Sequence, residues 1–250
     1  MKVIILAAGY ATRLWPLTLD KPKPLLKVGS KSIIDHIFSS INNVKGIKTI
    51  YVVTNSKFVN NFAKWKTRYP KKRIVVVDDG IDSLNERRGS IGDILFTINK
   101  KKIKEDILVV AGDNIFDFAI DDFVKTSKAN SPYVTTGLFD VKDMELAKQY
   151  GIVAVNRNSK IISFEEKPAK PKSTLAAMCL YYFPKEKLKL IRKYQRDGNP
   201  LDLAGTFIKW VSRKESVYGY KFNGRWLDIG DKKSLKRAQK LNWNQKRRGK

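Results

Sequence analysis

The sequence predicts an α/β fold, a Rossmann-like αβα sandwich around a mixed, mainly parallel central sheet. Two observations lead to this prediction. Short apolar runs alternate along the first half of the chain with segments whose apolar residues recur at helical spacing. The runs are also apolar throughout rather than alternately polar, which is typical of strands covered on both faces. In such a fold we expect a ligand at the carboxyl ends of the strands, beside a switch in strand order.

The elements follow one another in a regular order. Residues 3–7 form an apolar run that leads into a long loop with glycine and proline, and apolar residues then recur from 33 to 41. Further strands are predicted at 49–54, 73–77 and 107–111, with helices at 58–69 and 91–98 between them. After about residue 133 we expect strands at 133–139, 152–155 and 160–164, a hairpin turn at 156–159, and helices at 185–194, 203–211 and 232–241.

Length and composition favour one globular domain. The chain has 250 residues, of which 42% are hydrophobic and 11% aromatic, so it can bury a substantial core. We find no internal repeat and no Gly/Ser-rich linker. We therefore expect a single domain over residues 1–241, with halves at 1–135 and 136–241, and a basic tail at 242–250.

The charge is strongly positive. Lys and Arg number 50 against 24 Asp and Glu, which leaves +26 and favours anionic partners of several kinds, including nucleotides, phosphosugars and nucleic acids. Most of the excess lies in scattered lysines and in the tail, which solvated surfaces explain as well as nucleic-acid binding does. No interleaved basic and aromatic motif is present, so nucleic acid is the less favoured partner.

The remaining composition concerns compartment and excluded chemistry. The chain has no apolar run long enough for a membrane span and no signal-like start, so we expect no membrane insertion and a cytoplasmic protein. Cys179 is the only cysteine, which fits a reducing compartment. With His36 as the only histidine, the usual zinc sites and Cys-His or Ser-His-Asp nucleophiles are excluded.

The first loop carries the most specific motif. Residues 6–14 read LAAGYATRL, followed by PLT at 16–18 and PKPL at 22–25. After a strand, backbone N–H groups can converge on an anion, Gly9 allows a phosphate to approach closely, and Arg13 and Lys23 supply fixed positive charge. The loop therefore predicts a triphosphate cradle.

This motif resembles the signature of the sugar-1-phosphate nucleotidyltransferase family, close to L-A-A-G-x-G-T-R-L-x-P-L-T-x(4)-P-K-P-L. One position departs, because Ala11 stands where the family has its second glycine. The resemblance runs from Met1 to about Leu241. It implies catalytic roles for Arg13 and Lys23, and nucleotide contacts from Leu6, Ala7, Ala8, Gly9, Thr12, Arg13 and Lys23.

Two further segments supply carboxylates. The apolar run 107–111 ends on Gly112-Asp113, and residues 226–230 read WLDIG, which is similar to the family's W-x-D-x-G segment. The resemblance implies that Asp113 and Asp228 hold Mg²⁺, a cation that takes oxygen ligands and keeps waters and substrate phosphates around it. A turn-capping role for Asp113 stays open, and Asp231 is expected to be the N-cap of the last helix.

The second half resembles the family's acceptor segment, Y-G-x-V followed by E-K-P. Gly151 and Glu166 are implied to bind sugar hydroxyls, and Lys167 to hold the sugar phosphate as a third catalytic residue; an exposed charge pair before a proline turn is the alternative. Residues 177–181 occupy the stretch that shapes the sugar pocket. For the base, the resemblance implies the loop 84–90, with Gly89 at the family's glycine and Asn85 in place of an absent Gln.

The resemblance implies an enzyme that condenses a nucleoside triphosphate with a sugar 1-phosphate, releasing pyrophosphate through in-line attack on the α-phosphorus. The acceptor segment looks most like those of thymidylyl- and uridylyltransferases, so a hexose 1-phosphate with dTTP or UTP is favoured, and cytidylyl or guanylyl transfer stays open. Residues 1–135 are then the nucleotide half and 136–241 the sugar-phosphate half. A catalytically silent regulatory homologue and a nucleic-acid-binding protein are the alternatives, and homo-oligomerisation stays open.

Overall fold

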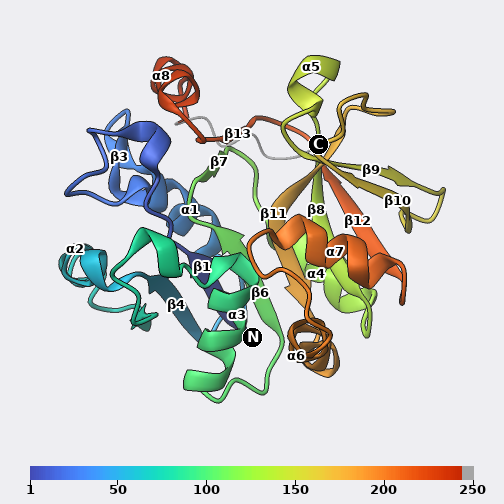
Figure 1. Ribbon diagram of the computed structural model, residues 1–250, viewed down its shortest axis with the longest axis horizontal. Helices are drawn as coiled ribbons and strands as arrows, with labels where there is room; N and C mark the ends of the chain where they lie inside the picture. The colour runs from blue at the N-terminus through green and yellow to red at the C-terminus, as the bar shows by residue number, and fades with distance from the viewer. Residues whose placement is uncertain (244–250) are drawn as a thin grey trace.

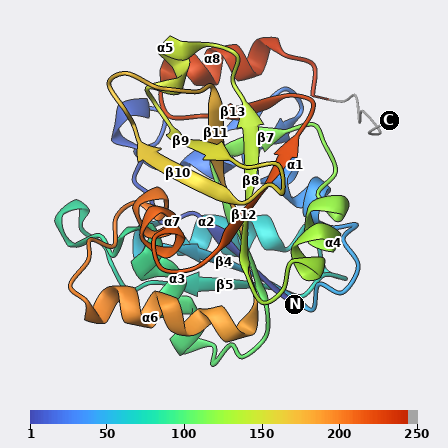
Figure 2. The same ribbon diagram turned by 90° about the vertical axis from the view of Figure 1, so that its right-hand side faces the viewer.

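The fold is built on one nine-stranded mixed sheet. The computed structural model describes residues 1–243, so most of the basic tail lies outside the described residues. Along the sheet the strand order is β10-β9-β11-β6-β1-β4-β5, and β8 pairs with both β11 and β12 (Figures 1 and 2). The strands of this sheet are β1 Lys2–Leu6, β4 Thr49–Thr54, β5 Ile74–Asp78, β6 Ile107–Ala111, β8 Val134–Asp140, β9 Gly151–Val155, β10 Ile161–Glu166, β11 Leu175–Phe183 and β12 Val217–Phe222.

The first half of the sheet is parallel, as the sequence predicted. Strand β1 pairs in parallel with β4 on one side and with β6 on the other, and β4 pairs in parallel with β5. All residues of β4 and β6 are buried, in keeping with their uninterrupted apolar sequences. Because β1 has a later strand on each side, the strand order switches beside it, which is where an open α/β sheet places its ligand.

Helices cover both faces of the sheet. The helices are α1 Ile33–Ile41, α2 Val59–Lys66, α3 Gly89–Lys100, α4 Asp121–Ala129, α5 Met144–Ala147, α6 Leu188–Arg196, α7 Ala204–Ser212 and α8 Lys232–Lys240. Strand β1 shows the two sides: Val3 and Ile5 join the core under α1, α2 and α4, whereas Ile4 joins the core under α3, α6 and α7. In Figure 2, α6 and α7 accordingly lie on one side of β12 and α4 on the other. The αβα class predicted from the sequence is confirmed.

The second half continues the same sheet with more antiparallel pairs. Strand β11 runs antiparallel to β6, β8 and β9, and β9 and β10 form the predicted hairpin. Its turn is closed by the Asn156 side chain, which accepts hydrogen bonds from the N–H groups of Asn158 and Lys160. The sequence reading missed β11, β12 and α4. Strand β11 reads LAAMCLYYF and is apolar throughout, so its sequence did carry a strand signal, whereas β12 is interrupted by Gly219 and Lys221.

Two short strands from distant parts of the chain meet outside the main sheet. Strand β7, Asn114–Phe116, pairs antiparallel with β13, Trp226–Asp228, and Figure 1 shows them side by side. This pairing brings the Gly-Asp and W-x-D-x-G segments together. A similarly small hairpin, β2 Lys27–Val28 with β3 Lys31–Ser32, precedes α1. Among residues 1–243 no helix is both long and apolar enough to span a bilayer.

Candidate active site

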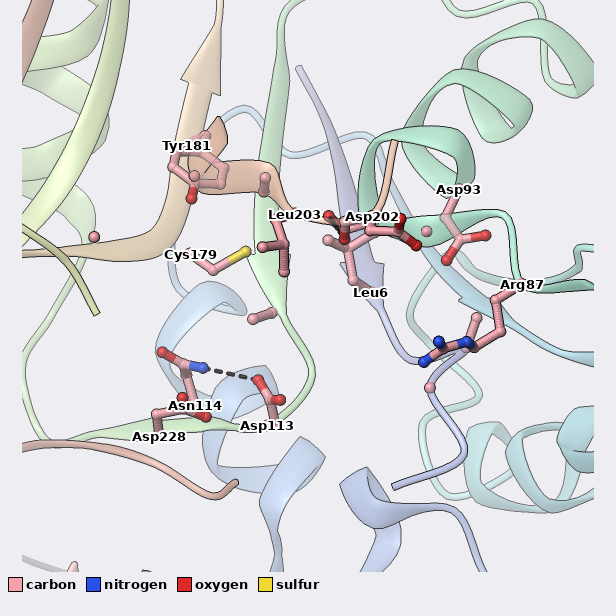
Figure 3. Close-up of a pocket in the computed structure, with 18 of the residues that line it drawn as sticks. Leu6, Arg87, Asp93, Asp113, Asn114, Cys179, Tyr181, Asp202, Leu203 and Asp228 are labelled. Carbon is pink, nitrogen blue, oxygen red and sulfur yellow. Dashed lines mark hydrogen bonds between the residues drawn. The ribbon is translucent and has the colours of Figure 1, made fainter. Parts of the chain in front are cut away.

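A pocket of about 640 Å³ opens at the carboxyl ends of β1 and β6, where Leu6 and Ala111 line it. The switch in strand order therefore coincides with the pocket, as expected for this class of sheet. Its walls come from both halves of the chain. Figure 3 shows Asp113, Asn114 and Asp228 gathered at one end, Asp93 and Arg87 at another, and Cys179 and Tyr181 on the wall formed by β11.

The loop after β1 presents its backbone to this pocket. Ala8 and Gly9 line the pocket, and the Asn55 side-chain amide donates a 2.8 Å hydrogen bond to the Ala8 carbonyl, which fixes the loop. Ala7 plays a different part from the one implied by the resemblance, because it is buried and its N–H is taken by the Val53 carbonyl at 2.9 Å. The N–H groups that remain available for phosphate are thus those after Ala7.

Ala11 adopts a left-handed backbone conformation, with φ 51° and ψ 47°. This is a conformation in which glycine is favoured, and for an L-residue it costs on the order of 1–2 kcal/mol. The Ala11 carbonyl is held by the Thr18 hydroxyl at 2.9 Å and by the Leu14 N–H at 2.9 Å. The backbone conformation usually supplied by a glycine is therefore kept without one. Thr12 and Arg13 follow as exposed residues of a short 3₁₀ turn.

Asp113 is the centre of a hydrogen-bonded chain of side chains. Lys23 donates to one of its carboxylate oxygens at 2.6 Å, and the Asn114 amide donates to the other at 2.8 Å, the contact drawn in Figure 3. Trp226 in turn donates to the Asn114 carbonyl oxygen at 2.6 Å. Burial would raise the pKa of Asp113, but the Lys23 charge and these hydrogen bonds outweigh it and lower the pKa. Asp113 is consequently ionised and fixed in place.

Asp228 lies beside Asp113 because β13 pairs with β7. Asp228 is opposite Asn114 in that pairing, and the next N–H, of Ile229, donates to the Asp113 carbonyl at 3.0 Å. Burial and the neighbouring Asp113 charge raise the pKa of Asp228, while the charges of Lys23, Arg13 and Lys167 act in the opposite direction. Two close carboxylates whose mutual repulsion is only partly offset provide a suitable place for a divalent cation.

The donor set fits Mg²⁺ specifically. Magnesium keeps several waters and binds through one or two carboxylates together with substrate phosphates, so Asp113 and Asp228 suffice as protein ligands. Within the described part of the chain no group of three or more His, Cys, Asp or Glu side chains has metal-binding spacing, which argues against a fully protein-ligated ion.

The acceptor wall carries a buried carboxylate. Glu166 lines the pocket, its Oε2 is buried without a partner among residues 1–243, and burial raises its pKa. A Cβ atom added at Gly205 would collide with the Glu166 carboxyl group, so this glycine makes room for it, whereas one added at Gly151 would collide with the Phe164 ring. Lys167 also lines the pocket, with φ 45° and its N–H donated to the Tyr150 carbonyl at 3.0 Å. This wall thus offers an acceptor for hydroxyl groups and a nearby cation.

The loop implied for base recognition is arranged differently from the expectation. Gly89 lines the pocket with φ 75°, and a Cβ there would collide with the backbone of Leu201 and Asp202. Those two residues accept hydrogen bonds from the first N–H groups of α3: Ile91 to Leu201 at 2.9 Å and Ser90 to Asp202 at 3.2 Å. Gly89 is therefore required by close packing of the two halves. Asn85 is exposed and does not line the pocket.

The residues singled out from the sequence fall into two groups. Those that line the pocket are Leu6, Ala8, Gly9, Gly89, Asp113, Gly151, Glu166, Lys167 and Asp228. Those that do not are Ala7, Thr12, Arg13, Lys23 and Asn85. Lys23 is nevertheless bonded to Asp113, and Arg13 lies near Gly230, close enough for its charge to affect the pKa of Asp228. Asp231 caps α8 as predicted, by accepting the Ser234 N–H at 2.7 Å.

Several pocket residues were missed from the sequence. Asp79 and Asp93 line it from the end of β5 and from α3, and residues 202–205 close over it from the second half. Asp93 does carry a signal, since it is an acidic residue within the otherwise apolar segment 91–98. Residues 202–205 carry none, because only the packing against α3 places them at the pocket.

Comparisons with known proteins agree with this geometry. A crystal structure described as a putative glucose-1-phosphate thymidylyltransferase from Bacillus anthracis, in complex with sucrose, matches with a TM-score of 0.82. The match has 23% sequence identity and covers 98% of each chain, which establishes a shared fold. The family model described as nucleotidyl transferase matches residues 2–244. Nearly the whole chain is included in that match, and the protein therefore belongs to the nucleotidyl transferase family.

Proposed function

We propose that the protein transfers a nucleotidyl group from a nucleoside triphosphate to a sugar 1-phosphate, giving an NDP-sugar and pyrophosphate. The observation that carries the proposal is the meeting of Asp113 and Asp228 in one pocket, which the first loop, Glu166 and Lys167 also line. This arrangement provides one place for a triphosphate, one for a metal and one for a phosphorylated sugar.

The first loop and its cations account for binding of the triphosphate. Ala8, Gly9 and Tyr10 line the pocket and can offer their backbone to phosphate oxygens, and Arg13 and Lys23 add positive charge where negative charge builds on the departing pyrophosphate. Lys23 is bonded to Asp113 in this structure, so it is already held beside the reacting centre. Such preorganised charges contribute more to rate than mobile ones do, because they need no rearrangement during the reaction.

The opposite wall accounts for the acceptor. Lys167 lines the pocket, and its charge partly opposes the rise in the pKa of both Glu166 and Asp228, which supports a position for it near both the sugar wall and the metal site. There it can hold the sugar phosphate and orient one of its oxygens for in-line attack. The buried, unpartnered Glu166 oxygen is suited to accept a hydrogen bond from a sugar hydroxyl.

Asp113 and Asp228 would hold a magnesium ion, which would supply charge neutralisation to the phosphates when bound. The protein's own part is to fix both carboxylates, and the chain from Trp226 through Asn114 to Asp113 does so with hydrogen bonds of 2.6 and 2.8 Å. We therefore regard Asn114 and Trp226 as positioning residues.

For the acceptor we propose a hexose 1-phosphate, in line with the resemblance of the E-K-P segment. For the donor, that resemblance favours dTTP or UTP, whereas the side chains at the base end of the pocket favour another class of base. The deciding assay mixes the purified protein with Mg²⁺, each of ATP, CTP, GTP, UTP and dTTP, and a panel of hexose 1-phosphates. Pyrophosphate release that depends on both substrates, with an NDP-sugar detected by mass spectrometry, is the expected result. Release without any sugar phosphate, or none with any pair, would contradict the proposal.

A further inference from the structure

The end of the pocket away from the metal site is acidic. Asp79 and Asp93 both line it, and in Figure 3 Asp93 lies well apart from the cluster of Asp113, Asn114 and Asp228. Helix α3 places Asp93 there from its first turns, and the end of β5 leads directly into Asp79. The two side chains interact, since Asp79 raises the pKa of Asp93 by its charge and by a side-chain hydrogen bond, after the larger effect of burial.

Asp93 has an unmet capacity to accept hydrogen bonds. The residue is 7% exposed, and its Oδ1 is buried without a partner among residues 1–243. Asp79 is 2% exposed, and its Oδ1 accepts the Ile81 N–H at 2.8 Å. A buried acceptor without a donor is costly, so a site lined by one favours a ligand that brings the donor.

The protein offers this pair no closely bonded cation. In the described chain no Lys or Arg nitrogen lies within ion-pair distance of Asp79 or Asp93. Arg88 is nearby, but its Nε donates to the Asp79 backbone carbonyl at 2.9 Å and its guanidinium lies over the Phe96 ring, 4.5 Å from the centroid. No cation of the described chain therefore pairs with Asp93 Oδ1, which is left for a ligand.

The position of the pair identifies which part of the ligand it meets. If the proposed function holds, the triphosphate lies between the first loop and the Asp113–Asp228 site, so the base extends toward the opposite end. There the α3 N–H groups of Ser90 and Ile91, which could have donated to a base carbonyl, are already bonded to Asp202 and Leu201. These two N–H groups are consequently not available to a base carbonyl, whereas Asp93 Oδ1 is available as an acceptor.

We propose that Asp93, supported by Asp79, selects a nucleobase that carries an exocyclic amino group over uracil and thymine. The amino groups of cytosine, adenine and guanine donate hydrogen bonds that a carboxyl oxygen accepts. Uracil and thymine carry carbonyl oxygens at the corresponding edge. These would face the unpartnered Asp93 Oδ1 as one acceptor against another, because the proton of the Asp79–Asp93 hydrogen bond lies between those two carboxyl groups. The proposal rests on nucleotidyl transfer being the function, and it replaces dTTP and UTP with CTP, GTP or ATP as the expected donor.

The test compares nucleotides by binding and by turnover. Isothermal titration of the wild-type protein with the five nucleoside triphosphates and Mg²⁺ should give at least about tenfold tighter binding for one of ATP, CTP or GTP than for UTP and dTTP. In Asp93→Asn the amide can donate as well as accept, so this ratio should fall to within about threefold. The control Asp82→Asn removes the same charge from an exposed position in the neighbouring loop and should keep the wild-type ratio.

The outcomes separate the two proposals. Tightest binding of UTP or dTTP to the wild-type protein would overturn the base assignment while leaving nucleotidyl transfer intact. Equal weakening of all five nucleotides in Asp93→Asn would also overturn it, because a structural role predicts no change in their ratio. Binding of none of the five would instead defeat the proposed function, and the base assignment with it. The wild-type ranking needs no variant, so the test stands even if Asp93→Asn fails to fold.

Discussion

The pocket holds two pairs of carboxylates with opposite surroundings. Asp113 is bonded to Lys23 at 2.6 Å, and the charges of Lys23, Arg13 and Lys167 also act on Asp228. Asp79 and Asp93 have no such ion pair among the described residues, and burial raises the pKa of both, as it also does for Asp228. The pairs thus differ in their cations: carboxylates beside fixed cations are suited to a metal with its phosphates, and those without are suited to hydrogen bonding with a neutral ligand.

The largest expected effect comes from the metal end. Asp113→Asn and Asp228→Asn should each lower kcat by at least about 10³-fold, since losing an ionised ligand removes several kcal/mol of charge stabilisation. Steady-state rates at several Mg²⁺ concentrations provide the measurement, and EDTA should abolish the wild-type activity. Asp122→Asn, an exposed acidic residue of α4, is the control. Full activity of Asp228→Asn would contradict a metal role for the Asp113–Asp228 pair, and with it the contrast to Asp79 and Asp93.

The cations around the metal end should have the next largest effect. Lys23→Ala and Arg13→Ala should each reduce kcat by about 10²-fold, by analogy with removing one preorganised donor. Lys21→Ala, an exposed lysine two residues before Lys23, should not. A Lys23→Ala protein that loses thermal stability and keeps its turnover would show that the Lys23–Asp113 pair is purely structural.

The variant Lys167→Ala tests whether Lys167 acts on the sugar-phosphate acceptor or on the nucleotide. Its loss in Lys167→Ala should raise the acceptor KM and lower kcat, together by tens of fold, because a charge that contacts the nucleophile both binds and orients it. Calorimetry should show NTP affinity within a few-fold of wild type, and the exposed Lys170→Ala should resemble wild type throughout. Loss of NTP binding with a normal acceptor KM would instead show that Lys167 belongs to the triphosphate site.

The acidic base end should also be visible in folding stability. Burial and the neighbouring Asp79 raise the pKa of Asp93 from its ordinary 3.8 to about 7. Between these values the folded state holds a proton that the unfolded state has released, so the wild type loses stability as pH rises toward 7. Asp93→Asn has no titrating group at this position. Its free energy of unfolding, relative to that of the wild type, should therefore rise by on the order of 1–4 kcal/mol between pH 4 and pH 8. Urea unfolding of both proteins at pH 4 and pH 8 measures this change. A stability difference between them that is the same at both pH values would contradict the raised pKa of Asp93.

The smallest effect concerns the first loop. Ala11→Gly should raise the free energy of unfolding by at most about 1 kcal/mol, because relief at φ 51° exceeds the added freedom of the unfolded chain. Ala169→Gly, at an exposed loop position, should instead lose a little stability. Turnover should stay unchanged in both variants. Marked destabilisation by Ala11→Gly would mean that packing of the Ala11 methyl outweighs the strain.

The sequence by itself determined the αβα class, the position of the phosphate loop and most residues of the candidate site. These features are local: a buried parallel strand is apolar along its whole length, and the loop motif sets its own backbone conformation, including the left-handed one at Ala11.

The tertiary structure alone decided how distant segments meet. Pairing of β7 with β13 sets Asp228 beside Asp113, and docking of residues 201–202 on α3 occupies the N–H groups of Ser90 and Ile91. The same docking makes Gly89 obligatory and leaves Asn85 outside the pocket. Such contacts join residues far apart in the chain, and no periodicity or spacing records them. The exposure and partners of a carboxylate, and with them its pKa, are therefore fixed only by the folded chain.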